Sequence, residues 1–112
     1  MARRHHPRAA LADVLIARFA ARVRARFPGA PAGEERRIAR YACGRGTERV
    51  GALVGADGYL DHAVELAVIA HIRHHRTRYE ALLDAAYDRD AARELVRPDV
   101  LATLARWGRD TP

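Results

Sequence analysis

The feature that most constrains the fold is a stretch near the middle of the chain, residues 63–83, which reads AVELAVIAHIRHHRTRYEALL. Its first half, residues 63–72, carries a single charged side chain. Four basic or titratable residues then follow in a row: Arg73, His74, His75 and Arg76. A helix that is apolar on nearly all sides is typically buried in the middle of a bundle. The stretch therefore predicts a buried central helix, at about residues 62–76, with a cationic C-terminal end.

Polar residues at both ends of this central helix predict its boundaries. Asp61 is placed to cap its N-terminus. Thr77 and Glu80 have the spacing of a capping box, which predicts that a new helix begins after Thr77. On a wheel at about 100° per residue, His71 lies on the side of Val64, whereas His74 and His75 lie near the C-terminal corner. We therefore expect His71 to face the core.

The N-terminal part of the chain predicts two further helices. Apolar side chains recur every four residues from Leu11 to Phe27, as in an amphipathic helix over residues 8–27. Its arginine-rich face also resembles a transit peptide or a membrane-surface helix, but no cleavage site follows it, and a packed helix with a basic face is the expectation. Pro31 suits the first turn of a second helix, which places Glu34 near its positive end and stops near Gly44.

Two more helices are expected after the central stretch. A short one begins at Asp88 or Asp90, and the last one has Pro98 in its first turn. No alternating pattern of the kind that strands show is present. The sequence thus predicts an all-α fold, a single small domain of about five to six helices over residues 8–112, preceded by a short basic arm, residues 1–7.

Charge is distributed unevenly along the chain. All 20 basic residues are arginine, which fits drift in a GC-rich genome, and the formal net charge is +6. Residues 1–56 contain twelve arginines and four acids, whereas residues 57–112 contain eight arginines and ten acids. Such a positive half is typical of a surface that binds a polyanion. Eight side chains are candidates for phosphate contacts: Arg18, Arg22, Arg26, Arg45, Arg49, Arg73, His74 and Arg76.

Cysteine content and hydropathy indicate the redox compartment of the protein and whether it spans a membrane. Cys43 is the only cysteine, so no internal disulfide can form and a reducing, cytoplasmic compartment is expected. No apolar run approaches the ~20 residues that a membrane span needs. We therefore expect no membrane-spanning segment.

The histidines permit a metal or catalytic hypothesis, although the pattern is incomplete. His71 with His74 or His75 has the spacing of paired ligands on one helix face, but a metal site needs three or four ligands. Third ligands could be sought among three residues: Asp84, Glu80 and Cys43. Cys43 beside Arg45 could act as a nucleophile with a histidine as base, but a small buried apolar cysteine is commoner and is the expectation here. We assign no catalytic residue, metal or cofactor.

The string from Ala70 to Leu83, AHIRHHRTRYEALL, resembles the family known as domain of unknown function 2293, with the pattern A-H-[IV]-R-H-x-x-T-x-Y-[DE]-x-L-L. Weaker similarities occur in the family's order at residues 27–31, 47–51, 91–93 and 104–107. Glu48 stands where the family has a small residue. The resemblance covers about residues 27–107 and implies a helical domain of unassigned activity. It marks six pattern positions without assigned roles: Arg49, His71, Arg73, His74, Thr77 and Tyr79.

Three hypotheses of function follow. The first is a non-catalytic helical module that binds nucleic acid or another polyanion through its arginine- and histidine-rich face. The second is a protein-interaction domain that docks on a partner, or on a second copy of itself, through Leu11, Leu15 and Phe19 of the first helix. The third is a histidine- or metal-dependent hydrolase. We favour the first hypothesis because of the charge distribution. Its main candidates are Arg49, Arg73 and His74, which we expect to share one exposed site.

Overall fold

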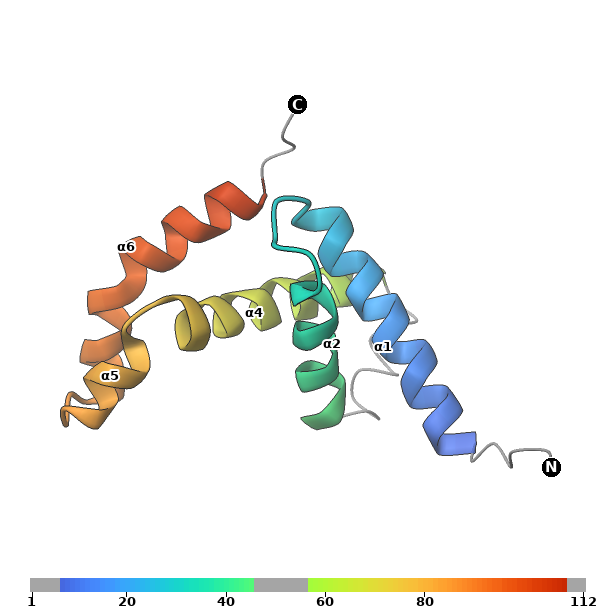
Figure 1. Cartoon of the computed structure of the whole chain (residues 1–112), viewed down its shortest axis with the longest axis horizontal. Coiled ribbons are helices and arrows are strands. Elements are labelled where there is room, and N and C mark those ends of the chain that lie inside the picture. Colours follow the sequence, from blue (N-terminus) through green and yellow to red (C-terminus); the bar gives the residue numbers. More distant parts are fainter. Residues whose placement is uncertain (1–6, 46–56, 109–112) are drawn as a thin grey trace.

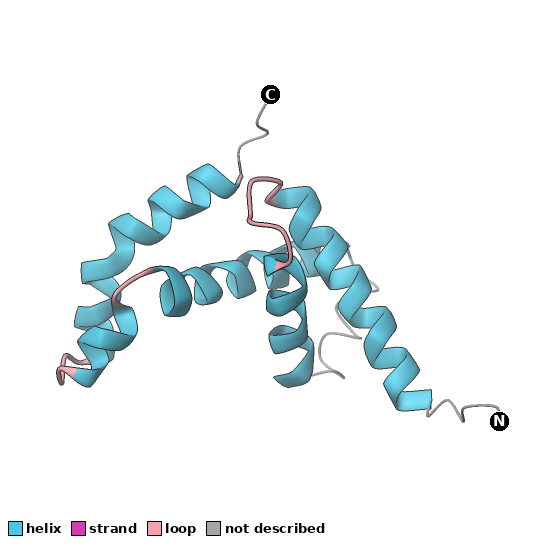
Figure 2. Cartoon of the chain, in the orientation of Figure 1, coloured by secondary structure: helices cyan, strands magenta, loops and turns pink. Residues whose placement is uncertain are grey.

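The computed structural model describes residues 7–45 and 57–108 of the chain. These residues form helices only, joined by short loops (Figure 2). The helices are α1 (Pro7–Arg26), α2 (Glu34–Arg45), α4 (Asp57–Arg76), α5 (Tyr79–Asp84) and α6 (Arg89–Trp107). The all-α prediction is confirmed. Within the described ranges no helix has the length and hydropathy that a membrane crossing requires.

Helix α4 is the centre of the fold, as predicted for this stretch. It contacts each of the other four helices, and Figure 1 shows α1 and α2 on one part of it and α5 and α6 on the other. Its buried residues recur every four positions: Leu60, Val64, Val68 and Ile72. The helix is not buried on every side, because Leu66 is 54% exposed and Ile69 is only partly buried. It ends at Arg76 as expected but begins earlier, at Asp57.

The predicted cap at Asp61 is wrong. Because α4 begins at Asp57, Asp61 lies inside the helix. Its carboxylate accepts hydrogen bonds from the guanidinium of Arg22 in α1, one of them 2.9 Å long from Nη2 to Oδ2. This interhelical ion pair lowers the pKa of Asp61, chiefly through the hydrogen bond from Arg22. The residue stabilises the packing of α1 on α4 instead of starting a helix.

The apolar ladder of α1 is largely confirmed. Leu15, Phe19, Val23 and Phe27 are buried, whereas Leu11 at the N-terminal end of the ladder is 56% exposed. Of the three residues proposed to dock on a partner protein, Leu15 and Phe19 are therefore already covered by the protein's own core, and only Leu11 is exposed.

Arg24 holds the turn between α1 and α2. Its Nε donates to Glu35 Oε2 at 2.8 Å, and its Nη1 donates to the carbonyl oxygens of Pro28 and Ala30 at 3.0 and 2.6 Å. Because α2 starts at Glu34, Pro31 precedes the helix and does not lie in its first turn. Three carbonyl groups of this turn thus have a charged donor, since Nη2 also reaches the oxygen of Pro31 at 3.2 Å.

Helices begin after Thr77 and at Asp88, as predicted, but the contacts at the first of these junctions differ from the prediction. Thr77 ends α4 by donating to the carbonyl of Arg73 at 2.6 Å, and it accepts from the amide of Tyr79 at 3.1 Å. No capping box forms, because the Glu80 carboxylate pairs with the His74 ring instead. Asp88 is the N-cap of α6, where it accepts from the amide of Ala91 at 2.8 Å.

Helix α6 continues through Pro98, so the prediction that this proline starts the last helix is wrong. A proline inside a helix removes one hydrogen bond and bends the axis. Figure 1 shows α6 bending along its length. The helix persists because buried side chains on both sides of the proline, Val96 and Val100, pack on α4 and α5.

The C-terminal end of α6 meets the loop after α1 at Gly29. The amide of Gly29 donates to the carbonyl of Trp107 at 2.8 Å, and Figure 1 shows the end of α6 reaching the loop after α1. A Cβ on Gly29 would lie 2.5 Å from the carbonyl oxygen of Arg106. Such an approach of two backbones requires glycine at this position.

Candidate functional site

A buried carboxylate links α2 to the C-terminal end of α4. Glu34, in the first turn of α2, is buried with its side chain only 5% exposed. Its Oε2 accepts a hydrogen bond from His71 Nε2 at 2.9 Å, and its Oε1 accepts one from Arg76. Arg37 Nη1 lies 3.8 Å from Oε2. The carboxylate is therefore surrounded by cationic or hydrogen-bonding groups from both helices.

The pKa values of this cluster favour an ionised glutamate and a neutral histidine. Burial acts to raise the pKa of Glu34, but the hydrogen bonds from Arg76 and His71 outweigh it and lower the pKa. Burial also lowers the pKa of His71, more than the neighbouring carboxylate raises it. Since an ionised carboxylate only accepts hydrogen bonds, Nε2 of His71 carries the hydrogen.

Aromatic contacts enclose the same cluster. The ring of His71 lies 4.7 Å from the ring of His75 and 6.4 Å from that of Trp107, measured between centroids. The guanidinium carbon of Arg76 lies 5.8 Å from the centroid of Trp107. His71 therefore faces inward, as predicted. Its contacts with Glu34 and Trp107 link α2, α4 and α6.

The stability of this cluster is expected to depend on pH through His71. A folded-state pKa below the ordinary value of about 6.5 means that the unfolded chain binds the proton more readily. The free energy of unfolding should therefore fall as the pH is lowered below about 6.5, by up to about 1.4 kcal/mol per pH unit. Urea unfolding of the wild type and His71→Gln between pH 7 and pH 5 measures this, because the glutamine lacks the titration. Parallel curves for the two proteins would contradict the assignment.

The outer face of α2 carries only cations and an aromatic ring. We define this α2 outer face by Arg36, Arg37, Arg40 and Tyr41, all exposed, with Arg37 65% exposed at its side chain and Tyr41 66%. Both acids of the helix turn away from it: Glu34 towards α4 and Glu35 towards Arg24. The result is a positive surface on a helix whose own carboxylates are already paired.

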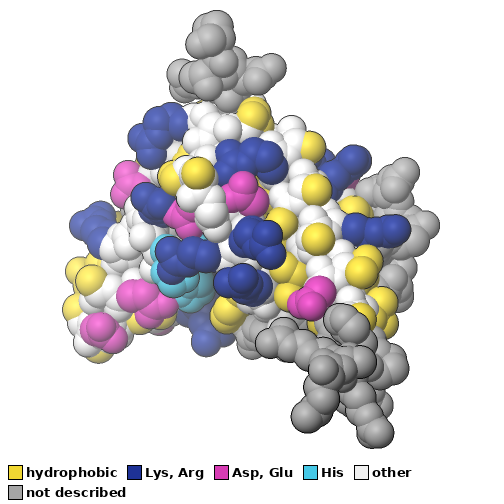
Figure 3. Space-filling model, turned by 45° about the vertical axis from the view of Figure 1, so that its right-hand side comes forward, with side chains coloured by type: hydrophobic (Ala, Val, Ile, Leu, Met, Phe, Trp, Pro, Cys, Tyr) yellow, Lys and Arg dark blue, Asp and Glu magenta, His cyan; other side chains and the backbone are white. Residues whose placement is uncertain are grey.

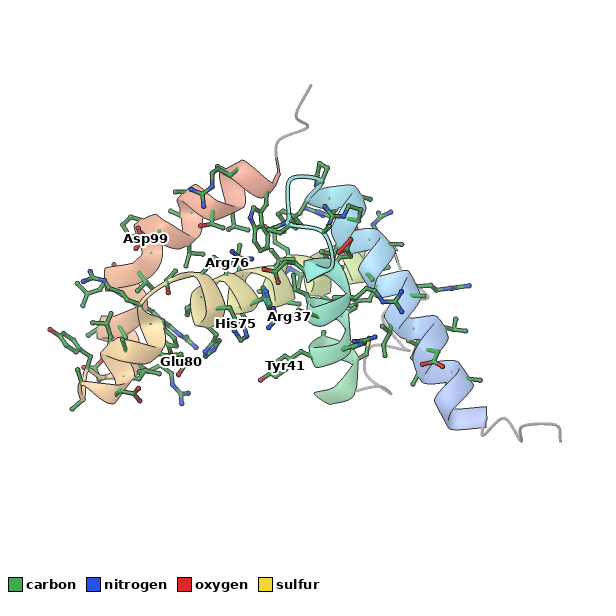
Figure 4. All side chains as sticks on the ribbon, in the orientation of Figure 1. Arg37, Tyr41, His75, Arg76, Glu80 and Asp99 are labelled. Carbon is green, nitrogen blue, oxygen red and sulfur yellow. The ribbon has the colours of Figure 1, made fainter. Side chains whose placement is uncertain are left out.

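The C-terminal end of α4 extends this surface. Figure 4 shows His75 and Arg37 between α4 and α2, with Tyr41 further along α2. Figure 3 shows arginine side chains beside the histidine side chains in the middle of the visible face. His75 and Arg76 are both exposed overall, so the buried carboxylate lies below a cationic rim.

None of the four residues of the α2 outer face was among the candidates named from the sequence. Arg36, Arg37, Arg40 and Tyr41 were missed, although their spacing carries a signal. The buried side chains Ile38, Ala39 and Cys43 share one side of α2. At about 100° per residue, positions 36, 37, 40 and 41 lie on the other side. The role of Glu34 itself could not be read from the sequence, since its partners lie 37 and 42 residues away.

Two of the three candidate arginines of α1 are used within the fold. Arg22 pairs with Asp61, and Arg26 lies 3.7 Å from carboxylate oxygens of both Asp61 and Glu65. Arg18 is exposed. Asp61 and Glu65 of α4 thus compensate the positive charges of Arg22 and Arg26 of α1.

The family-pattern residues at the α4–α5 junction have different surroundings. His74 pairs with Glu80 and packs edge-on against Tyr79, with ring centroids 5.1 Å apart. Tyr79 is buried, and the guanidinium carbon of Arg73 lies 5.8 Å from its ring centroid. Arg73 then lines a groove between α4 and α6, a different place from the surroundings of His74.

Two candidate phosphate-binding side chains lie outside the part of the chain that the structure describes. Arg49 lies outside the described residues, and the side chain of Arg45 does so too, although that residue ends α2. Convergence of Arg49 with Arg73 and His74 therefore stays a prediction.

The groups considered for metal or covalent chemistry are dispersed in the described part of the chain. No set of three His, Cys, Asp or Glu side chains there is arranged to hold a metal ion. Cys43 is buried in the core, 1% exposed, and burial raises the pKa of its thiol. A raised pKa disfavours the reactive thiolate.

Comparison with known proteins tests the family resemblance that the string from Ala70 to Leu83 indicates. Residues 22–108 match the family described as uncharacterized conserved protein, DUF2293. No curated protein and no solved structure matches the chain. The match covers α2, α4, α5 and α6 and the end of α1, including Gly29 and the cluster around Glu34. By this match over most of its length, the chain belongs to the DUF2293 family of uncharacterized conserved proteins.

Proposed function

We propose that this protein binds nucleic acid, without catalysis, through the α2 outer face and the adjoining end of α4. The observation that carries the proposal is the arrangement of charge on α2. Its arginines and Tyr41 are exposed, while both of its glutamates are turned inward and paired. Arg37 lies 3.8 Å from Glu34, whereas Arg36 and Arg40 have no ion pair within the described residues, so the surface as a whole attracts phosphates.

The exposed tyrosine favours single strands over duplex. Single-strand binding proteins combine a basic surface along the backbone with aromatic rings on which bases stack. Tyr41 lies one residue after Arg40 and one helical turn after Arg37, so a strand whose phosphates bind these arginines brings a base within reach of the ring. The net charge of +6 and a pI near 10.6 support the same partner. A cytoplasmic location, as the single cysteine favours, fits this role.

Binding should weaken steeply with salt. Fluorescence anisotropy of a labelled single-stranded oligonucleotide, from about 50 to about 200 mM salt, measures the slope of log affinity against log salt. Each phosphate contact contributes about −0.7 to this slope for single strands. Arg36→Gln, Arg37→Gln and Arg40→Gln together should flatten it by about 2. Absence of binding to single strands or duplexes at about 50 mM salt would refute the proposal.

Tyr41→Ala separates stacking from charge. Loss of one base stack costs about 1–3 kcal/mol, so single-strand affinity should fall by about five-fold or more while duplex affinity changes little. The matched control for the arginine variant replaces Arg78, Arg89 and Arg106 by glutamine, which removes three exposed arginines outside α2. If this control weakened binding as much as the α2 variant, the binding would be a property of net charge and not of the α2 outer face.

A further inference from the structure

A groove of about 470 Å³ lies between α4 and α6. Its volume is in the range of pockets that bind small molecules, about 300–1,000 Å³. Apolar side chains from both helices line part of it, among them Ile69, Val100 and Leu104. Three arginines complete the lining: Arg73 from α4 and Arg93 and Arg97 from α6. The groove thus combines an apolar wall with several guanidinium groups.

The arginines of the groove lack counterions within the fold. None of Arg73, Arg93 and Arg97 forms an ion pair with a carboxylate of the residues that the structure describes. Arg73 is partly buried, and its guanidinium lies over the face of the Tyr79 ring. Burial and the nearby charge of Arg93 lower the pKa of Arg73. A partly desolvated cation beside a second cation is unfavourable without an anion.

The two acids of the groove lie at its outer side. Asp90 and Glu94 are exposed residues of α6. At about 100° per residue, the order around α6 starting from buried Val100 is Arg93, Arg97, Asp90 and then Glu94. Arg93 is therefore nearest to the apolar wall and Glu94 is farthest from it. An anion bound beside Val100 is closest to the guanidinium group of Arg93.

The groove is separate from the proposed nucleic-acid surface. Arg73 and His71 are two residues apart on α4, and two residues correspond to about 200° of rotation, so they project on opposite sides of the helix. His71 faces Glu34 of α2, whereas Arg73 faces α6.

We propose that the groove between α4 and α6 binds a small phosphate monoester that carries an apolar group. Arg73 and Arg93 hold the phosphate, since guanidinium groups match its oxygens in charge and geometry. Ile69, Val100 and Leu104 contact the apolar group. Arg97 contributes a further charge at the mouth.

The test is a titration of ¹⁵N-labelled protein with phenyl phosphate at low ionic strength, followed by NMR. The amide signals of Ile69, Arg73, Arg93 and Leu104 should shift, and phenyl phosphate should bind about ten-fold more tightly than inorganic phosphate. Phenol, which lacks the anion, should cause no comparable shifts. Equal shifts at exposed arginines throughout the protein would overturn the proposal, because they indicate unspecific ion binding.

Variants locate the site. Arg93→Gln, at an exposed position that should not disturb folding, should weaken phenyl phosphate binding about ten-fold, and Arg73→Gln should do the same. Arg106→Gln removes an exposed arginine from another side of α6 and should leave binding unchanged. Unchanged binding in Arg93→Gln would overturn the proposal. The protein with its three α2 outer-face arginines replaced should still bind phenyl phosphate, which separates this site from the nucleic-acid surface.

Discussion

Gly29→Ala is expected to destabilise the protein by about 3 kcal/mol. The new Cβ would lie 2.5 Å from the carbonyl oxygen of Arg106 and 3.1 Å from Cα and the carbonyl oxygen of Trp107, all of them backbone atoms. Backbone cannot rotate aside as a side chain can, so the loop or the end of α6 must move. Overpacking of this kind costs about 1–3 kcal/mol, and loss of the bond from the Gly29 amide to Trp107 adds about 1 kcal/mol.

Urea and thermal unfolding followed by circular dichroism measure this effect, which corresponds to a fall in melting temperature of about 10 °C or more. Gly44→Ala is the matched control. Its added Cβ would meet nothing within 4 Å, and an alanine in a helix is more favourable than a glycine by about 0.5–1 kcal/mol. We expect this control to be neutral or stabilising. Equal stability of Gly29→Ala and the wild type would show that the two backbones do not approach so closely.

Glu34→Ala is expected to cost about 3 kcal/mol. Removal of one partner of a buried ion pair is costly because it leaves the remaining groups without a counterion. Here the side chain is 5% exposed and accepts from both His71 and Arg76. Arg76 is 42% exposed at its side chain and can turn to solvent, which keeps the expected cost at the lower end of the range for buried pairs, about 3–5 kcal/mol. The loss would loosen α2 from the end of α4.

Chemical unfolding at pH 7 tests this prediction, with Glu65→Ala as the control. Glu65 is half exposed and lies 3.7 Å from Arg26, so its ion pair should contribute less than about 1 kcal/mol. The carboxylate of Glu34 should also stabilise the fold only while it is ionised. Because its folded-state pKa is lowered, this contribution is present above the ordinary glutamate pKa of about 4.3 and is lost as the pH falls through the folded value. Equal stability of Glu34→Ala and Glu65→Ala would contradict the role assigned to the cluster.

Several features of the fold could be predicted because they depend on neighbours a few residues apart. The spacing of Leu15, Phe19 and Val23 placed one face of α1 in the core, and Asp88 could be identified as a helix start. The inward position of His71 followed from the same reasoning. Local rules failed where a distant group competed. Asp61 pairs with Arg22 of α1, and Glu80 pairs with His74, so neither acts as predicted at a helix end.

The sequence by itself determined that the chain is helical, that α4 is its centre, and that arginine dominates its charge, since helical periodicity and composition are local properties. Only the tertiary structure decided which charges remain exposed. Arg22 and Arg26 of α1 are paired with acids of α4. On the α2 outer face only Arg37 reaches a carboxylate within the described residues, that of Glu34 at 3.8 Å. The physical reason is that an ion pair depends on distance in space, and partners such as Glu34 and Arg76 are brought together only when the helices pack.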